Sequence, residues 1–214
     1  MATLRAAAVD PLPAPSETLA IDFANTRYWR GSRVPSESLT GPADLVDWAG
    51  STALVPVSLV QRCRARWAAH PKEGEAALAD ALGWREAIYR ALAAASAGAE
   101  VSPDDVARLN AALARAPVRQ RLGLDPDGPG GGGRGWAVGA VSPSGDALLA
   151  PVLWSAGDLL TGGRLDKVRR CANPECGWLF LDDSRAGKRR WCSMSSCGNR
   201  AKARRHYHKS RAEG

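Results

Sequence analysis

The feature that most constrains the fold of this chain is a group of four cysteines near its C-terminal end. The chain has five cysteines in 214 residues, and the sequence CANPECGWLFLDDSRAGKRRWCSMSSC holds four of them. They form two pairs with the same CxxxxC spacing, and fifteen residues separate the pairs: Cys171, Cys176, Cys192 and Cys197. Such a grouping indicates a small module organised around its thiols.

The N-terminal sequence MATLRAAAVDPLPAPSETLA contains no continuous apolar core of a signal peptide. No later segment approaches the roughly 18 uninterrupted apolar residues of a membrane span. We therefore expect a cytoplasmic protein with reduced cysteines and no membrane partner. Two closely spaced pairs of thiolates can then bind one zinc ion per chain in a tetrahedral site. Four thiols without a metal, structural or redox-active, are the alternative.

The residues between the cysteine pairs predict a compact finger. WLFL at 178–181 is a short apolar strand, DDSRAG at 182–187 is turn material, and KRRW at 188–191 can return to Cys192 as the second strand. We expect a helix to start at Cys197, with Gly198 at a positive φ and Asn199 as a helix cap. Knuckle, hairpin and helix in this order are typical of a treble-clef-like zinc finger.

The net positive charge of the protein lies entirely in this part of the chain. Residues 164–214 contain 14 Lys and Arg against 5 Asp and Glu, whereas residues 1–163 contain 15 against 17. This asymmetry favours a polyanionic partner, nucleic acid rather than a membrane surface. The candidate nucleic-acid-binding residues are Lys188, Arg189, Arg190, Arg200, Lys202, Arg204, Arg205, Lys209 and Arg211. A solvated tail is the alternative, and Arg200 could equally brace the zinc site.

The first 163 residues predict a mainly α-helical domain with one small β-hairpin. Apolar residues recur at helical spacing over 41–50, 56–70, 73–98, 102–116 and 147–163, the last with a bend near Pro151. Ser102 stands as N-cap before Pro103. Two short alternating segments, 118–124 and 134–141, flank a glycine-rich loop and predict the hairpin. Cys63, Trp48, Trp67, Trp84 and Trp154 fall on apolar helix faces and are expected in the core.

A polar and aromatic segment, DFANTRYW at 22–29, is the candidate small-molecule site. Its candidate ligand-binding residues are Asp22, Asn25, Thr26, Arg27 and Trp29. Asp22 and Asn25 could instead cap a helix or brace a turn. No nucleophile elbow, phosphate-binding loop, paired-carboxylate signature or dinucleotide fingerprint is present, so the sequence does not indicate an enzyme. The chain has three histidines. His70 lies at a predicted helix end, and His206 and His208 are not needed as metal ligands because four cysteines complete the set.

The four cysteines, together with Gly198, Asn199 and Arg200, resemble the CGNR zinc finger, whose name repeats the residues from Cys197 to Arg200. Upstream, LAIDFANTRYWRG at 19–31 and LLAPVLWSAGDLLTGG at 148–163 resemble the ABATE domain that usually precedes this finger. The resemblance spans nearly the whole chain. It implies a bacterial stress-response regulator of transcription, with Cys171, Cys176, Cys192 and Cys197 as metal ligands, and it carries no catalytic residue.

The sequence thus predicts two units, a sensing or dimerising helical domain at 1–163 and a zinc finger at 164–214. The preferred function is a regulator that presents the basic helix after Cys197 to duplex DNA, as a monomer or a homodimer, with or without a small-molecule effector. An RNA-binding module is one rival. An enzymatic N-terminal domain with an accessory finger is the other.

Overall fold

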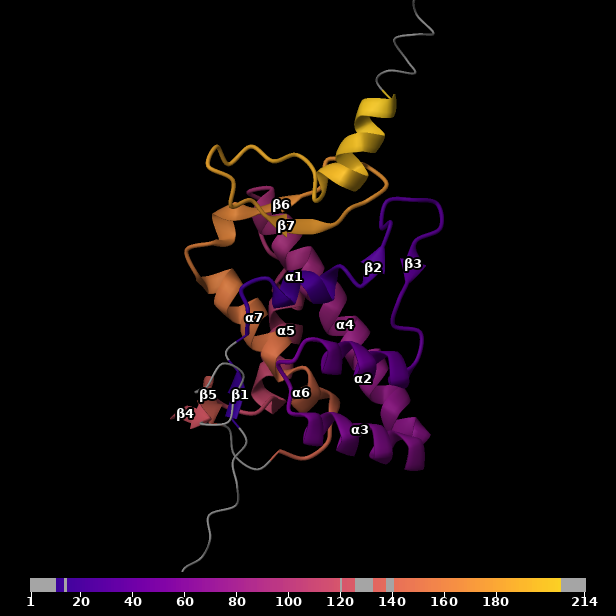
Figure 1. Cartoon of the computed structure of the whole chain (residues 1–214), viewed down its shortest axis with the longest axis vertical. Helices are drawn as coiled ribbons and strands as arrows, with labels where there is room; N and C mark the ends of the chain where they lie inside the picture. Colours follow the sequence, from indigo (N-terminus) through magenta and orange to yellow (C-terminus); the bar gives the residue numbers. More distant parts are fainter. Residues whose placement is uncertain (1–10, 14, 120, 126–132, 138–140, 205–214) are drawn as a thin grey trace, which may run out of the picture.

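A computed structural model of the chain describes residues 11–13, 15–119, 121–125, 133–137 and 141–204. Figure 1 shows a helical body, with the C-terminal segment at one end and the last described helix projecting away from it. The helices of the body are α1 (Leu19–Ala24), α2 (Pro42–Ser51), α3 (Val57–Ala69), α4 (Pro71–Ser96), α5 (Pro103–Arg115), α6 (Gly145–Leu148) and α7 (Ala150–Thr161). The expectation of a mainly α-helical protein is confirmed.

Prolines and acidic side chains define where these helices begin. In α2, Pro42 opens the first turn, and the carboxylate of Asp44 accepts hydrogen bonds from the backbone N–H groups of Thr40 and Gly41 at 2.8 and 2.9 Å. In α5, Ser102 occupies the N-cap before Pro103, as expected, but its side chain makes no capping hydrogen bond. The expected bend near Pro151 is a break between α6 and α7 at Leu149, because proline has no N–H to continue the helical ladder.

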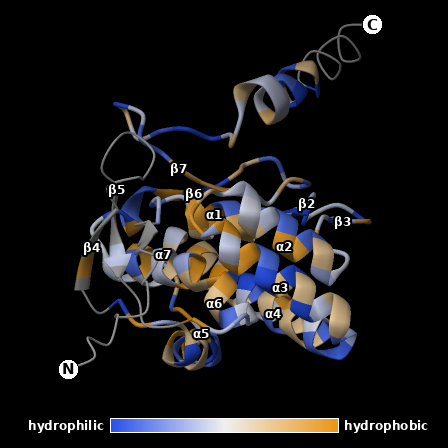
Figure 2. Cartoon of the chain, turned by 60° about the horizontal axis from the view of Figure 1, so that its bottom comes forward, coloured by the Kyte–Doolittle hydropathy of each residue, from blue (hydrophilic) through white to orange (hydrophobic). Residues whose placement is uncertain are grey.

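The hydrophobic core lies where α1, α4 and α7 meet. α1 packs against both α4 and α7, and Figure 2 shows that α1 is strongly hydrophobic. Phe23, Ile88 and Leu153 are buried at this junction. The expected core residues Trp67, Trp84 and Trp154 are buried, Cys63 is fully buried, and Trp48 is partly buried against the same core. Burial raises the pKa of Cys63 to about 11, so this thiol stays protonated at neutral pH.

Two small antiparallel sheets accompany the helices of the body. β4 (Arg121–Asp125) pairs with β5 (Gly133–Ala137), with Leu122 opposite Trp136, so the predicted hairpin is confirmed. β1 (Pro11–Pro13) pairs with the other edge of β5 and makes a three-stranded sheet. β2 (Arg27–Tyr28) and β3 (Ser36–Glu37) form a two-stranded ladder that the sequence did not predict, because two residues a strand leave no readable alternation.

The C-terminal segment contains a hairpin whose strands are not the expected pair. β6 (Val168–Arg170) follows a short 3₁₀ turn, η1 (Leu165–Lys167), and pairs antiparallel with β7 (Leu179–Leu181). The predicted partner, 188–191, is not a strand. Its backbone is held by single contacts instead: the N–H of Arg189 donates to the Asp182 carboxylate at 2.8 Å, and the Arg190 carbonyl accepts from Ala172 at 2.8 Å.

The helix of this segment begins earlier than the sequence suggested. A π-helical turn, η2 (Met194–Gly198), opens after the N-cap Ser193 and continues as α-helix over 199–204. Asn199 is therefore inside the helix, where its amide donates to the Ser195 carbonyl at 3.3 Å, and it does not cap the start. Gly198 does not have a positive φ. A Cβ added at this position would lie 2.6 Å from the sulfur of the Met194 side chain.

The C-terminal hairpin is packed into the main core. Val168, Leu179 and Leu181 belong to the same buried cluster as the helices, and β6 and β7 both contact α4. A second buried cluster lies beyond β7 and consists of Phe180 with three of the paired cysteines. Among the described residues, no helix has the length and hydropathy needed to cross a membrane.

Candidate metal centre and basic helix

The paired cysteines come from two parts of the C-terminal segment, the β6–β7 connection and the region of η2. Cys171 directly follows β6, and Cys176 closes the turn that leads to β7. Cys192 precedes η2, and Cys197 lies within η2. Three of the four are buried and Cys192 is partly exposed. All four sulfur atoms lie within 4.8 Å of one another, so the two pairs predicted from the sequence meet at a single point.

The sulfur separations fit a tetrahedral zinc ion. With Zn–S bonds of about 2.3 Å, the sulfur atoms of a regular tetrahedron are about 3.8 Å apart. The Cys176 and Cys192 sulfurs are 3.7 Å apart, and those of Cys192 and Cys197 are 3.8 Å apart. No cysteine of the described chain forms a disulfide. The four cysteines therefore form a site for one Zn²⁺ per chain, as the sequence predicted.

A bound cation is needed for all four thiols to ionise together. Burial raises the pKa of Cys176 to about 12, and burial together with the neighbouring thiols raises the pKa of Cys192 above the ordinary value. The pKa of Cys197 is lowered: burial opposes ionisation, but hydrogen bonds from Asn173 and the other thiols outweigh it. Four thiolates this close repel one another strongly unless a metal ion neutralises them.

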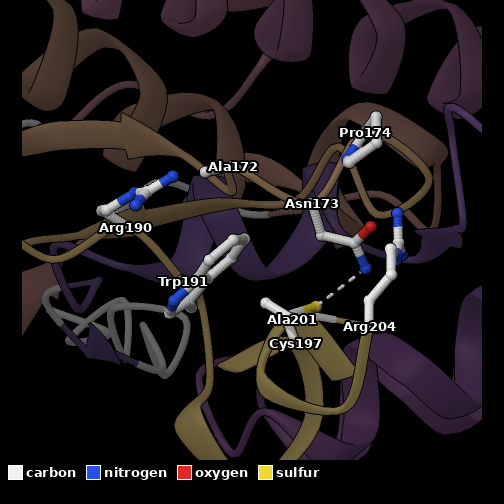
Figure 3. A pocket seen from close by; sticks show the side chains of 8 residues that line it. All are labelled: Ala172, Asn173, Pro174, Arg190, Trp191, Cys197, Ala201 and Arg204. Atoms are coloured by element: carbon white, nitrogen blue, oxygen red, sulfur yellow. Dashed lines mark hydrogen bonds between the residues drawn. The ribbon is translucent and has the colours of Figure 1, made fainter. Parts of the chain in front are cut away.

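Asn173 is a ligand-orienting residue that the sequence analysis missed. It is buried, and its side-chain amide donates to the Cys197 sulfur at 3.5 Å, as Figure 3 shows. Its carbonyl groups also build the turn between the first two ligands, accepting from the N–H groups of Glu175 and Cys176 at 3.3 and 3.0 Å. The Asn-Pro pair inside the CxxxxC spacing was the available signal, since such pairs favour tight turns.

The turn between Cys171 and Cys176 is docked on the 22–31 segment. The Asn25 side chain forms two hydrogen bonds to the backbone of Leu179, accepting from its N–H at 3.0 Å and donating to its carbonyl at 2.9 Å. The N–H groups of Arg30 and Gly31 donate to the carbonyls of Cys176 and Glu175 at 3.1 and 3.2 Å. This segment therefore orients the metal-binding turn.

The remaining predicted ligand-binding residues have different hydrogen-bond or ion-pair partners, and only some of them line a common cavity. The buried Thr26 hydroxyl donates to the Phe23 carbonyl and accepts from Arg85. Arg27 lies 3.7 Å from the Glu86 carboxylate. Within the described part of the chain, the Asp22 carboxylate accepts a hydrogen bond only from the Thr18 hydroxyl. Asp22, Asn25 and Thr26 line one cavity, which Arg27 and Trp29 do not line. The hydrogen bonds of Asn25 with Leu179 support the alternative interpretation of the sequence, in which Asn25 braces the structure.

Tyr89 and Arg30 also contact the finger, and the sequence analysis missed both. The Tyr89 hydroxyl donates to the Gly177 carbonyl at 2.8 Å. The Arg30 guanidinium lies 3.9 Å from the Tyr89 ring centroid and forms a double hydrogen bond with Glu86 at 2.7 and 3.1 Å. Gly177 has φ of 69°, and a Cβ there would come within 3.0 Å of Arg30. These contacts are long-range, so local patterns could not reveal them.

The predicted nucleic-acid-binding residues fall into two groups: those that contact other parts of the protein and those for which exposure is the main feature. Arg189 lies over the Phe180 ring at 4.6 Å and donates to the Cys192 carbonyl at 2.7 Å, so it supports the finger. Arg200 is exposed but lies 4.3 Å from the Trp29 ring centroid. Lys188, Arg190, Lys202 and Arg204 are exposed. Arg205, Lys209 and Arg211 lie outside the described residues, as do His206 and His208.

Arg190 and Arg204 come together at one cavity beside the metal centre. With Trp191 and Cys197 they line a cavity of about 260 Å³, and Figure 3 shows the two arginines on opposite sides of it. The Arg190 guanidinium lies 5.2 Å from the Trp191 ring centroid. Both arginines lie near a zinc tetrathiolate centre with a net charge of about −2. They can offset that charge or contact an anionic partner outside it.

The fold and the site define a class of protein: a four-thiolate zinc finger docked on a helical domain. Two family models match accordingly. Residues 17–163 match ABATE, described as "Putative stress-induced transcription regulator", and residues 167–210 match the CGNR zinc finger. The first match covers more than half of the chain, and the chain belongs to the ABATE family. No curated protein matches it. Neither family description is that of an enzyme.

Proposed function

We propose that this protein is a zinc-dependent DNA-binding regulator of transcription. The finger presents the helix that follows Cys197 to duplex DNA, and the helical domain senses a ligand or forms a homodimer. The observation that carries the proposal is the placement of that helix. It is anchored at Cys197, projects away from the body (Figure 1), and exposes Arg200, Lys202 and Arg204.

The charge of this helix needs a partner that the described chain does not supply. Neither Lys202 nor Arg204 forms an ion pair among the described residues. DNA carries about one negative charge per 1.7 Å of its axis, and cations that contact phosphates release its counterions. The description of the ABATE family as a transcription regulator supports the regulatory part of this role.

The salt dependence of DNA binding tests the proposal. A double variant, Lys202→Gln with Arg204→Gln, removes two cations from the projecting helix. If both contact phosphates, the slope of log K against log salt flattens by up to about 1.8. The matched control is Lys72→Gln with Arg62→Gln, which removes the same charge from exposed positions on the helical body. An unchanged slope in the helix variant, with zinc content of one per chain, would contradict the proposal.

A competitor of single-stranded RNA separates DNA from the rival partner. RNA recognition relies on aromatic stacking of unpaired bases, and the projecting helix offers no aromatic side chain among its described residues 194–204. We therefore expect duplex DNA to displace RNA at equal nucleotide concentration. The reverse order would replace DNA with RNA as the partner.

A further inference from the structure

A second cavity is lined in part by residues of the 22–31 segment. It has a volume of about 420 Å³. Its walls come from α1 and β2, from α2, and from the finger residue Trp178. Three aromatic side chains and three carboxylates face this space: Tyr28, Trp48, Trp178, Asp22, Asp44 and Asp47. The two parts of the protein thus share the cavity.

The aromatic side chains give the cavity its shape and leave ring surface accessible. The Tyr28 and Trp178 rings have centroids 5.3 Å apart, and their planes are tilted by 48°. Trp48 packs on Phe23, with centroids 4.9 Å apart, and this holds its ring in place at the wall. Tyr28 belongs to the β2–β3 ladder and is 40% exposed. Rings arranged around an open space can attract a cation through their faces.

The charged residues that line the cavity in the described chain are all acidic. Among the described residues that line it there is no lysine, arginine or histidine. Asp47 pairs with Arg64, and Asp44 is engaged as the cap of α2. Asp22 has no cationic partner among the described residues and accepts only the Thr18 hydroxyl, at 3.1 Å. Asp22 is an exposed residue, and partial burial of its carboxyl group raises the pKa, whereas the Thr18 hydroxyl lowers it in part. A bound cation would stabilise this carboxylate.

We propose that this cavity binds an organic ammonium ion, with the alkylammonium head against Tyr28, Trp48 and Trp178 and its charge balanced by Asp22. A metal ion fits the aromatic walls poorly, because rings do not coordinate hard cations. A neutral apolar ligand would leave the Asp22 carboxylate desolvated without compensation. A quaternary or alkylated ammonium matches both the rings and the carboxylate.

The site gives a chemical class to the ligand of the sensing role. The inference rests on the proposed function only in assigning that ligand a regulatory effect. Trp178 lies between Cys176, a zinc ligand, and Leu179, the residue that Asn25 holds. A ligand that contacts Trp178 and Asp22 therefore touches the finger and the helical body at once. Its binding energy would favour the docked arrangement of the two parts.

Calorimetry on the zinc-loaded full chain, without DNA, tests the site independently of DNA binding. The probes are choline, the larger benzyltrimethylammonium, and 3,3-dimethyl-1-butanol, a neutral isostere of choline. We expect saturable binding of at least one ammonium probe and binding of the isostere weaker by about tenfold or more. Equal binding of choline and its isostere, or binding of neither ammonium probe, would overturn the proposal.

Variants locate the binding. Asp22→Asn preserves shape and removes the charge, and Tyr28→Leu removes an exposed ring without disturbing the zinc ligands. Each variant should lower the affinity for the ammonium probe by about three- to tenfold. Asp104→Asn, on the exposed first turn of α5, is the matched charge control and should leave the affinity unchanged. If the two cavity variants bind as tightly as the control variant, the ligand is elsewhere and the assignment fails.

Discussion

The helical body and the zinc finger are stabilised by different interactions. The body buries a continuous set of apolar side chains from all seven of its described helices, among them Phe23, Leu45 and Leu153. The finger's own buried cluster holds Phe180 and three cysteines that bind the metal. Its strands contribute Val168, Leu179 and Leu181 to the core of the body instead. The finger thus depends on both a metal ion and the neighbouring domain, because so short a segment has too little apolar surface to fold alone.

Zinc loss should have the largest effect. Cys176→Ser, or removal of zinc by a chelator, should unfold the segment around the metal, because a structural zinc ion contributes roughly 10–16 kcal/mol of apparent binding energy at pH 7. The melting temperature of the body should fall as well, since β6 and β7 belong to its core. Metal analysis and thermal melting followed by circular dichroism measure both effects. An unchanged body melting transition would show that the two parts are independent.

A core truncation in the body should come next. Phe23→Ala removes a fully buried ring that packs on Trp48, and it should cost about 3–5 kcal/mol in the free energy of unfolding. Denaturant unfolding monitored by tryptophan fluorescence measures the loss. Val118→Ala, at a position that is 66% exposed, is the control and should change stability by less than about 0.5 kcal/mol. Equal effects from the two variants would be inconsistent with the observed core.

The contact between the two parts can be tested at Asn25. Asn25→Ala removes both hydrogen bonds to the buried Leu179 backbone, and unsatisfied buried backbone groups cost about 1–3 kcal/mol. We expect faster amide hydrogen exchange at Leu179, with zinc retained at one per chain. Asn25→Asp keeps the acceptor and loses the donor, so its effect on the Leu179 amide should be smaller. If amide exchange at Leu179 is unchanged in the alanine variant, Asn25 does not hold the two parts together.

An ion pair inside the body gives a pH-dependent prediction. Glu37 forms two hydrogen bonds of 2.6 Å with the buried Arg85. Its pKa is lowered: partial burial acts to raise it, but Arg85 outweighs this. The contribution of the pair is therefore present above the unfolded pKa of about 4.3 and is lost as the pH falls through the lower folded value.

Glu37→Gln should cost about 1–2 kcal/mol at pH 7, less than the roughly 3–5 kcal/mol of a fully buried pair, because Glu37 is partly exposed. Thermal melts from pH 7 to pH 3 should show the difference between variant and parent shrinking below about pH 4. A difference that stays constant over this range would show that ionised Glu37 does not contribute.

The smallest stability change is expected at Arg200. Its contact with Trp29 is exposed, and a cation–π contact of this kind contributes about 0.5–1 kcal/mol. Arg200→Gln should therefore lower the melting temperature slightly and leave zinc bound. The same variant distinguishes its two possible roles: a loss of sequence discrimination on DNA indicates base reading, whereas a shift in stability alone indicates a brace.

Local patterns were sufficient for the helices and the metal ligands. Each long helix shows apolar residues at helical spacing, and prolines mark the starts of α2, α4 and α5. The ligands were predictable because the CxxxxC pairs recur at a spacing suited to one metal ion. The partner of β7 was not predictable, because 188–191 and 168–170 are both short basic segments. The choice of β6 follows from Val168, which becomes fully buried in that pairing.

The sequence by itself determined where the long helices lie, which cysteines bind the metal, and where the positive charge is concentrated. These properties depend on spacing along the chain, which a sequence states directly. Only the tertiary structure decided the roles of individual polar residues: Asn25 as a clamp on Leu179, Arg189 as a support of Phe180, and Asp22 as a carboxylate that no cation of the described residues pairs with. Each role depends on a partner brought close by folding, and one short polar side chain can cap a helix, brace a neighbour or bind a ligand equally well until that partner is known.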